Sequence, residues 1–173
     1  MKKGFTLIEL LIVIAILAVL ATAVVLVINP AELIKQARDS TRISDLAALN
    51  SAIALYLSDV ASPKIAGPST ACTSATARCT ASTTSPFVKA CIQNATTTVD
   101  GNGWVLIKFT DVSAGSPLAR LPLDPVNDST NYYAYGCGAL NSTSYEIDAQ
   151  MESAKFAGGG GDVENKDGGS SST

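Results

Sequence analysis

The longest stretch of hydrophobic positions lies near the start of the chain. Residues 10–28 are nineteen positions, of which only Thr22 is polar. A helix rises about 1.5 Å per residue, so this stretch is about 28 Å long as a helix, close to the ~30 Å hydrocarbon core of a bilayer. The pattern therefore predicts a membrane-spanning helix over residues 5–28.

A break is predicted at Asn29 and Pro30, because proline removes a helical N–H and its ring clashes with the preceding turn. Apolar residues then recur at spacings of three and four, which predicts a second helix over residues 29–60 with one apolar stripe. The stripe consists of Leu46, Leu49, Ile53, Tyr56, Leu57 and Val60. We interpret five charged residues of this helix as part of its solvated face: Lys35, Arg38, Asp39, Arg42 and Asp45.

Residues 61–157 have the mixed pattern of a small globular domain. Strands are predicted at residues 104–109, 132–135 and 145–151, where β-favouring residues gather and, in the third, apolar and polar positions alternate. Turn-rich spacers between them favour an antiparallel order. The second helix can cover the apolar face of such a sheet, so the predicted fold class is α+β.

Local composition predicts the structure of the remaining segments of this domain and of the C-terminal residues. Serine and threonine dominate residues 68–86, which are predicted to be a loop. Ser85 followed by Pro86 is typical of a helix start and predicts a short helix over residues 87–92. Residues 158–173 are rich in glycine and serine, so we expect a flexible tail there.

Charge and composition narrow the classes of function. The net charge is −3 and the sequence pI is about 4.8, so the basic surface that binds nucleic acid is not expected. The chain contains no histidine, which excludes histidine-based catalysis and histidine metal ligands. The sequence shows no set of nucleophile, base and acid and no phosphate-binding loop. We therefore predict that the protein is not an enzyme.

The residues before the apolar run decide between several kinds of N-terminus. Lys2 and Lys3 would hold the start of the chain in the cytoplasm. A plain membrane anchor and a secretory signal cleaved at Ala21-Thr22-Ala23 are two simple interpretations. Glu9 argues against both, because a carboxylate costs about 2.5–3.5 kcal/mol at the centre of a membrane helix and less near its ends. Cleavage after Gly4 would supply a positive partner, the α-amino group of Phe5 on the same or a neighbouring chain.

The sequence Lys2-Lys3-Gly4-Phe5-Thr6-Leu7-Ile8-Glu9-Leu10-Leu11 resembles the class III signal of type IV pilins and type II secretion pseudopilins. The resemblance covers about the first sixty residues. It implies that residues 1–4 are a leader, which a prepilin peptidase removes between Gly4 and Phe5 before methylating the new amine. It also implies that Glu9 pairs with the Phe5 amine of an adjacent subunit, and that residues 5–28 become the core of a helical filament.

This resemblance makes a structural subunit of a surface filament the first functional hypothesis, with a role in adhesion, motility or uptake. Its partners would be copies of itself, the prepilin peptidase and the inner-membrane assembly platform. The precursor would lie in the cytoplasmic membrane and the assembled filament outside the cell. The alternatives are a pseudopilin of a type II secretion or DNA-uptake machine, or a membrane-anchored or secreted binding module.

Four cysteines follow the membrane segment, at positions 72, 79, 91 and 137. An exported domain is oxidised, so disulfides are expected rather than thiols or a zinc site. Four cysteines allow three pairings, which the sequence does not resolve. We favour Cys72–Cys79 within one loop and Cys91–Cys137 between the short helix and the sheet.

Oxygen-bearing side chains cluster before the second predicted strand, where Asp124 and Asp128 stand with Asn127 and Asn131. Calcium takes six to eight oxygen ligands, so Asp124 and Asp128 are candidate calcium ligands. The pattern of Leu121-Pro122-Leu123-Asp124-Pro125 also resembles pilins and major pseudopilins, and the latter have a calcium site in a loop of this region. An acidic, solvated turn explains the same residues, and no other cofactor is expected.

Overall fold

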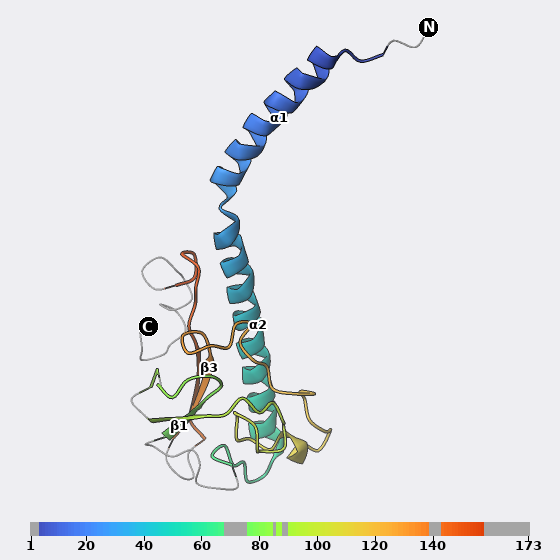
Figure 1. Cartoon of the computed structure of the whole chain (residues 1–173). Helices are drawn as coiled ribbons and strands as arrows, with labels where there is room; N and C mark the ends of the chain where they lie inside the picture. The colour runs from blue at the N-terminus through green and yellow to red at the C-terminus, as the bar shows by residue number, and fades with distance from the viewer. Residues whose placement is uncertain (1–3, 68–75, 85, 88–89, 139–142, 158–173) are drawn as a thin grey trace.

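A computed structural model of the chain describes residues 4–67, 76–84, 86–87, 90–138 and 143–157. Two helices form about the first third of the chain, α1 (Leu7–Ile28) and α2 (Pro30–Asp59). α1 projects away from the rest of the molecule at an angle to α2 (Figure 1). The predicted pair of helices is thus confirmed, with α1 beginning two residues later than expected.

The break between the helices lies at the predicted place. Asn29 adopts a left-handed conformation, with φ 45° and ψ 77°, and Pro30 begins α2. Asparagine tolerates this conformation better than most residues, and proline suits the first position of a helix because its missing N–H would have had no partner there.

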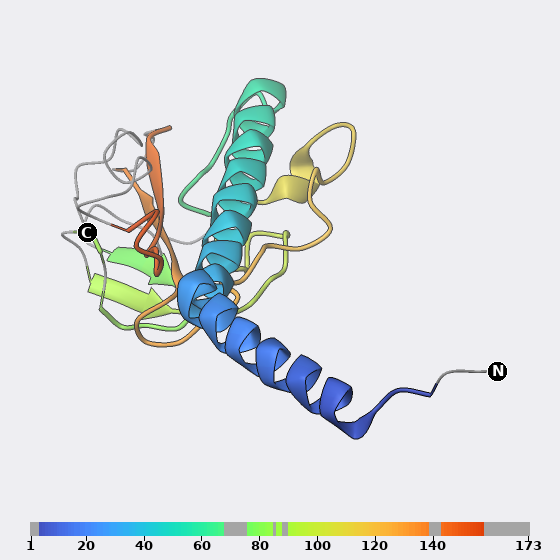
Figure 2. The ribbon, with the colours of Figure 1, turned by 90° about the horizontal axis from the view of Figure 1, so that it is seen from above.

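A four-stranded mixed sheet packs beside α2 (Figure 2). Its strands are β1 (Thr76–Cys79), β2 (Ala90–Gln93), β3 (Tyr133–Cys137) and β4 (Tyr145–Ala149), in the order β2-β1-β3-β4. β3 pairs antiparallel with both β1 and β4, whereas β1 and β2 are parallel. The α+β class and two predicted strands are confirmed, and the wholly antiparallel order is wrong.

Two predictions for the segment that follows α2 in the sequence are wrong as well. The short helix predicted over residues 87–92 is contradicted at residues 90–92, which belong to strand β2 and pair with β1. Part of the predicted loop over residues 68–86 is strand β1, in which Ala77 and Cys79 are buried. Strand pairing at long range therefore outweighed the local helix-start signal.

Residues 104–109, all of which the structure describes, form a loop that is buried except at Lys108, with one isolated bridge between Lys108 and Asp100 rather than a strand. Trp104 N donates to Thr96 O at 3.0 Å and Phe109 N donates to Val99 O at 2.9 Å, so these amides bond to another loop. Phe109–Asp111 forms the short 3₁₀ helix η1. The side chains of Trp104, Val105, Ile107 and Phe109 are fully buried and join α2 and β3 in the hydrophobic core. Burial was predicted correctly here, but strand geometry was not.

Candidate functional site

Gly4, Phe5 and Thr6 precede α1 as an extended segment. Phe5 is 86% exposed, and a Cβ placed on Gly4 would meet nothing within 4 Å. Gly4 is also absent from the residues with positive φ, the conformations that favour glycine. The fold of this chain therefore does not require glycine at position 4, and a requirement there would have to come from a partner such as a processing enzyme.

Glu9 has a local partner at the start of its own helix. Thr6 is the N-cap residue, and its Oγ1 accepts a hydrogen bond from Glu9 N at 3.3 Å. In return, Glu9 Oε2 accepts from Thr6 N at 2.8 Å and from Thr6 Oγ1 at 2.7 Å. This reciprocal arrangement is a capping box. The Thr-x-x-Glu spacing was visible in the sequence, so this second role for Glu9 could have been predicted.

α1 is apolar on every side and is not covered by the described part of the chain. The window Leu7–Val25 has a mean hydropathy of 2.9, and none of it is buried. By length and composition this one described helix could cross a membrane. The core helix of a soluble protein and a signal sequence meet the same two criteria. A helix that is apolar all round needs an apolar environment, which the described part of the chain does not supply.

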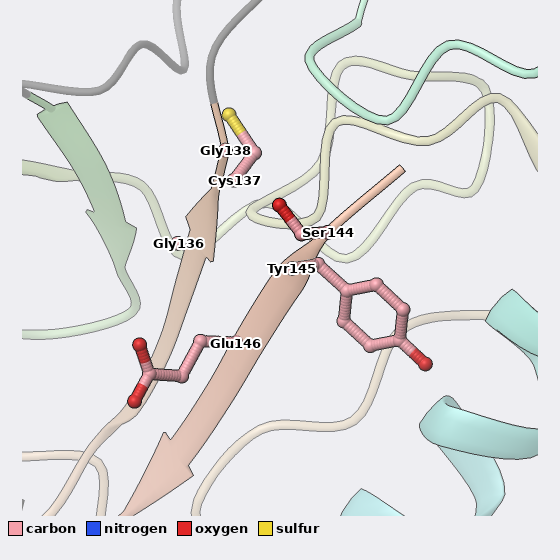
Figure 3. A pocket seen from close by; sticks show the side chains of 6 residues that line it. All are labelled: Gly136, Cys137, Gly138, Ser144, Tyr145 and Glu146. Carbon is pink, nitrogen blue, oxygen red and sulfur yellow. The ribbon is translucent and has the colours of Figure 1, made fainter. Parts of the chain in front are cut away.

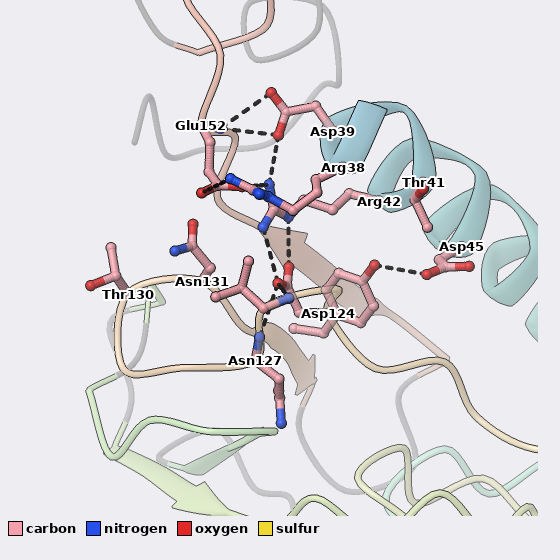
Figure 4. A network of polar contacts seen from close by, with 12 residues as sticks. Arg38, Asp39, Thr41, Arg42, Asp45, Asp124, Asn127, Thr130, Asn131 and Glu152 are labelled. Carbon is pink, nitrogen blue, oxygen red and sulfur yellow. Dashed lines mark hydrogen bonds and ion pairs between the residues drawn. The ribbon is translucent and has the colours of Figure 1, made fainter. Parts of the chain in front are cut away.

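A second candidate site lies where α2 meets the globular domain. We define the charged cluster as five residues: Arg38, Asp39, Arg42, Asp124 and Glu152 (Figure 4). Arg42 is its centre, with Nε 2.6 Å from Asp124 Oδ2, Nη1 2.7 Å from Asp39 Oδ1 and 2.9 Å from Glu152 Oε2. Arg38 Nε donates to Glu152 Oε2 at 2.6 Å. Two positive and three negative charges from three separate parts of the chain thus pair with one another.

The position of these charges corrects the interpretation of a solvated face. Asp39 and Arg42 are fully buried, and Arg38 is half-buried against Glu152. Asp45 accepts a hydrogen bond from the Tyr133 hydroxyl at 2.9 Å. The sequence pattern misled because charged residues are almost never fully buried unless they are paired, and the partners Asp124 and Glu152 lie about a hundred residues away in the sequence.

Burial and hydrogen bonding both act on the ionisation of the cluster. Burial favours the neutral form of Asp39, but hydrogen bonds from Ser153, the Glu152 amide and Arg42 outweigh it, so the pKa of Asp39 lies below its ordinary value. The hydrogen bond from Arg38 likewise lowers the pKa of Glu152. Burial acts against the charge of Arg42, but its carboxylate partners outweigh this and raise its pKa.

The candidate calcium ligands are turned toward other partners. Both oxygens of Asp124 accept from Arg42, and its Oδ1 also accepts from Val126 N at 2.8 Å. Asp128 Oδ1 accepts from the backbone amides of Thr130 and Asn131. Within the described residues no group of three or more acidic or cysteine side chains could hold a metal. Calcium at these two positions stays a prediction, and Arg42 argues against it because the ion would lie beside a positive charge.

The cysteine pairing differs from the one that we favoured. Cys79 is bonded to Cys91, with Cα atoms 5.9 Å apart, so the pairings Cys72–Cys79 and Cys91–Cys137 are both wrong. The parallel register that places Ala77 opposite Cys91 and Cys79 opposite Gln93 brings the two sulfurs together across neighbouring strands. Cys137 is also disulfide-bonded, and Cys72 lies outside the described residues.

One small cavity, of about 170 Å³, opens at the end of the β3–β4 pair (Figure 3). Cys137, Tyr145 and Glu146 line it with Ser144 and two glycines, Gly136 and Gly138. Glu146 and Tyr145 diverge there, and the Tyr145 hydroxyl donates to Asn50 Oδ1 on α2. This cavity therefore brings together no acid and base that could act as a catalytic pair.

Comparison with known proteins bears on the N-terminal segment. Residues 1–25 match the family described as the prokaryotic N-terminal methylation motif. Neither the curated proteins nor the solved structures gave a match to the chain. The matched residues include Gly4, Phe5, Glu9 and most of α1, and such a motif supports a protein of the pilin or pseudopilin type. The chain thus begins with the N-terminal methylation motif, the class III signal peptide of type IV pilins and pseudopilins.

Proposed function

We propose that this protein is the structural subunit of a type IV pilus-like surface filament, processed between Gly4 and Phe5 and assembled through α1. The observation that carries the proposal is the methylation motif over residues 1–25, joined to a helix that the described residues leave uncovered. The membrane would cover α1 before assembly, and the same helix of other subunits would cover it in the filament. The partners are further copies of the chain, the prepilin peptidase and the inner-membrane assembly platform.

The outward face of α2 supports the same mode of assembly. Eight of the exposed positions of α2 follow alternating spacings of three and four, and none of these eight is charged: Ile34, Ala37, Thr41, Ser44, Ala48, Ser51, Leu55 and Ser58. Small and apolar residues let neighbouring helices approach closely, and the 3.5-residue period is that of packed parallel helices. An ordinary surface helix would carry its charges on this face.

Processing is tested first, by mass spectrometry of the N-terminal peptide. We expect a chain that begins at Phe5 and carries an N-methyl group. Gly4→Leu should block cleavage while leaving the domain folded, because no neighbouring atom within 4 Å would meet a Cβ at that position. A mature chain beginning at Met1 or Val24 would contradict the proposal and favour an anchor or a signal peptide.

Assembly is tested with two variants that separate the roles of Glu9. Glu9→Gln keeps the capping box, since glutamine also serves at this position, but removes the charge. Thr6→Ala removes the cap and keeps the charge. Stranding one partner of a buried ion pair costs about 3–5 kcal/mol, whereas losing a cap costs about 1 kcal/mol. Each variant is co-expressed with the unmodified chain, and its fraction in sheared filaments is compared with its fraction in membranes.

We expect Glu9→Gln to be inserted and cleaved but depleted from filaments, and Thr6→Ala to be incorporated nearly in proportion to its abundance. Equal incorporation of Glu9→Gln would remove the assembly role of the carboxylate and leave the capping box as its only function. Electron microscopy of the cell surface distinguishes the related alternative, because a pseudopilin of a secretion or DNA-uptake machine shares the processing but not the long surface filament.

A further inference from the structure

α2 is held to the globular domain in two different ways along its length. In residues 46–59 the buried side chains are apolar or aromatic and belong to the hydrophobic core: Leu49, Ala52, Ile53 and Tyr56. In residues 30–45, all of which the structure describes, the buried side chains are Asp39 and Arg42. The first half of the helix is therefore held by charge and hydrogen bonds, and the second half by burial of apolar surface.

The first half is attached mainly to the segment that follows β4. We call residues 152–154 the polar strap. The backbone amides of Glu152 and Ser153 donate to the Asp39 carboxylate at 2.8–3.2 Å, and Ala154 N donates to Glu32 Oε1 at 2.6 Å. The Glu152 carboxylate in turn accepts from Arg38 and Arg42. The strap thus donates hydrogen bonds to carboxylates of α2 and accepts hydrogen bonds from its arginines.

Arg42 links this attachment to the loop before β3. Its guanidinium donates to Asp39 on its own helix, to Glu152 on the strap and to Asp124 on the loop (Figure 4). Without Arg42, these three carboxylates would face one another with Arg38 alone to balance them. Like charges repel strongly where water is excluded, so Arg42 supplies most of the charge balance of this attachment.

We propose that the polar strap is a release point, at which residues 30–45 of α2 can detach from the globular domain while the hydrophobic core stays folded. Local opening occurs where few apolar contacts hold a segment, and this segment contributes no residue to the apolar core. Once detached, a helical segment of this length is marginally stable in water, and serine and threonine at positions 40, 41 and 44 weaken it further.

The release point gives the molecule a second pivot. Asn29 already sets the angle between α1 and α2, and the second half of α2 is fixed in the core. Opening of the strap would let α1 and residues 30–45 move together relative to the domain. This inference does not depend on the proposed function, because it concerns only contacts within one chain.

Amide hydrogen exchange on the full chain in detergent micelles tests the proposal. Arg42→Gln is compared with Lys108→Gln, which removes the exposed ion pair between Lys108 and Asp111 and serves as the matched control. In Arg42→Gln we expect amide exchange to rise by at least about tenfold in residues 30–45 and 152–154. In β3, and throughout the control variant, it should stay within about twofold of the unmodified chain.

Two results would overturn the proposal. A rise of equal size in β3 and in residues 30–45 would mean that helix and core open as one unit. No rise in residues 30–45 would mean that the strap does not hold them. If Arg42→Gln does not fold, Arg38→Gln provides the test, because Arg38 is half-buried and contacts Glu152 alone within the cluster. The same two segments should then exchange faster by a smaller factor, and the same two results would contradict the proposal.

Discussion

α1 and the first half of α2 depart from ordinary surface helices in opposite ways. Large apolar side chains of α1 are 47–84% exposed, whereas α2 buries Asp39 and Arg42 completely. The buried charges of α2 find their partners inside the chain, at Asp124 and Glu152. The described chain offers α1 no such partner. Exposed apolar side chains and buried charges both indicate that a helix has a partner. Only the fold shows whether that partner is another part of the same chain or a different molecule.

The largest test of this comparison is to remove α1. A chain without residues 1–28 should stay folded, since no part of the Leu7–Val25 window is buried against the domain. It should also become soluble and monomeric without detergent, because the exposed apolar helix is gone. Size-exclusion chromatography and circular dichroism check both outcomes. A truncated chain that unfolds or aggregates would mean that α1 supports the domain.

The sequence was sufficient for the features that depend on neighbouring residues. The periodicity of apolar positions placed both helices, Pro30 placed the break between them, and alternation placed β4. Residues 104–109 show the limit of this reasoning. Apolar content predicted their burial, but their backbone geometry depends on carbonyl partners at Thr96 and Val99, which only the folded chain brings beside them.

The candidate sites divide in the same way. Gly4, Phe5 and Glu9 form one contiguous motif, so the sequence alone identified them, and the capping partner Thr6 lay within the same few residues. The charged cluster and the Cys79–Cys91 disulfide join segments that only the folded chain brings together. Spacing along the chain therefore could not have paired Arg42 with Asp124 or Cys79 with Cys91.

A pair of substitutions measures how far the two regions differ in stability. Trp104 is fully buried, donates from Nε1 to Pro122 O at 2.9 Å and lies against Tyr133, so Trp104→Ala should cost about 3–5 kcal/mol of unfolding free energy. Leu17→Ala on α1 should leave the stability of the domain unchanged, since Leu17 is 58% exposed. Urea denaturation followed by circular dichroism compares them. Equal losses would contradict the separation of α1 from the domain.

Removal of the Cys79–Cys91 disulfide should have a somewhat smaller effect. The two residues are 12 positions apart, and closing a loop of that size contributes about 3 kcal/mol in the chain-entropy account. The double variant Cys79→Ala, Cys91→Ala should therefore unfold at lower urea concentration with β1 and β2 still paired. Peptide mapping without reductant provides the control, since a Cys72–Cys79 peptide from the unmodified chain would contradict the pairing itself.

Acid should weaken the charged cluster. Asp39 and Glu152 have folded pKa values below their ordinary values of 3.8 and 4.5, so their stabilisation is present above those values and is lost as the pH falls through the lower, folded ones. We expect the melting temperature of the domain to fall below about pH 4.5. In Glu152→Gln this fall should be less steep, whereas Asp111→Asn should leave it unchanged. A pH profile that is the same in all three chains would contradict this role of the cluster.

The smallest effect is expected from calcium, because the charged cluster already contains its own cation. The Arg42 guanidinium occupies both oxygens of Asp124, at 2.6 and 3.0 Å, and an ion bound there would have to displace it or lie beside it. Asp128 alone offers far fewer than the six to eight oxygens that calcium takes. The melting temperature should therefore be the same in about 1 mM calcium as in a chelator.

A calcium site with a dissociation constant of about 10 μM would add about 2.7 kcal/mol to the free energy of unfolding at that concentration. The melting temperature would then rise by roughly ten degrees in a domain of this size. If such a shift occurs and Asp128→Ala abolishes it, the candidate calcium site is real and the cluster does take an external partner. If the shift survives in Asp128→Ala, calcium binds elsewhere in the chain. The charged cluster would then still find its partners within the chain, unlike α1.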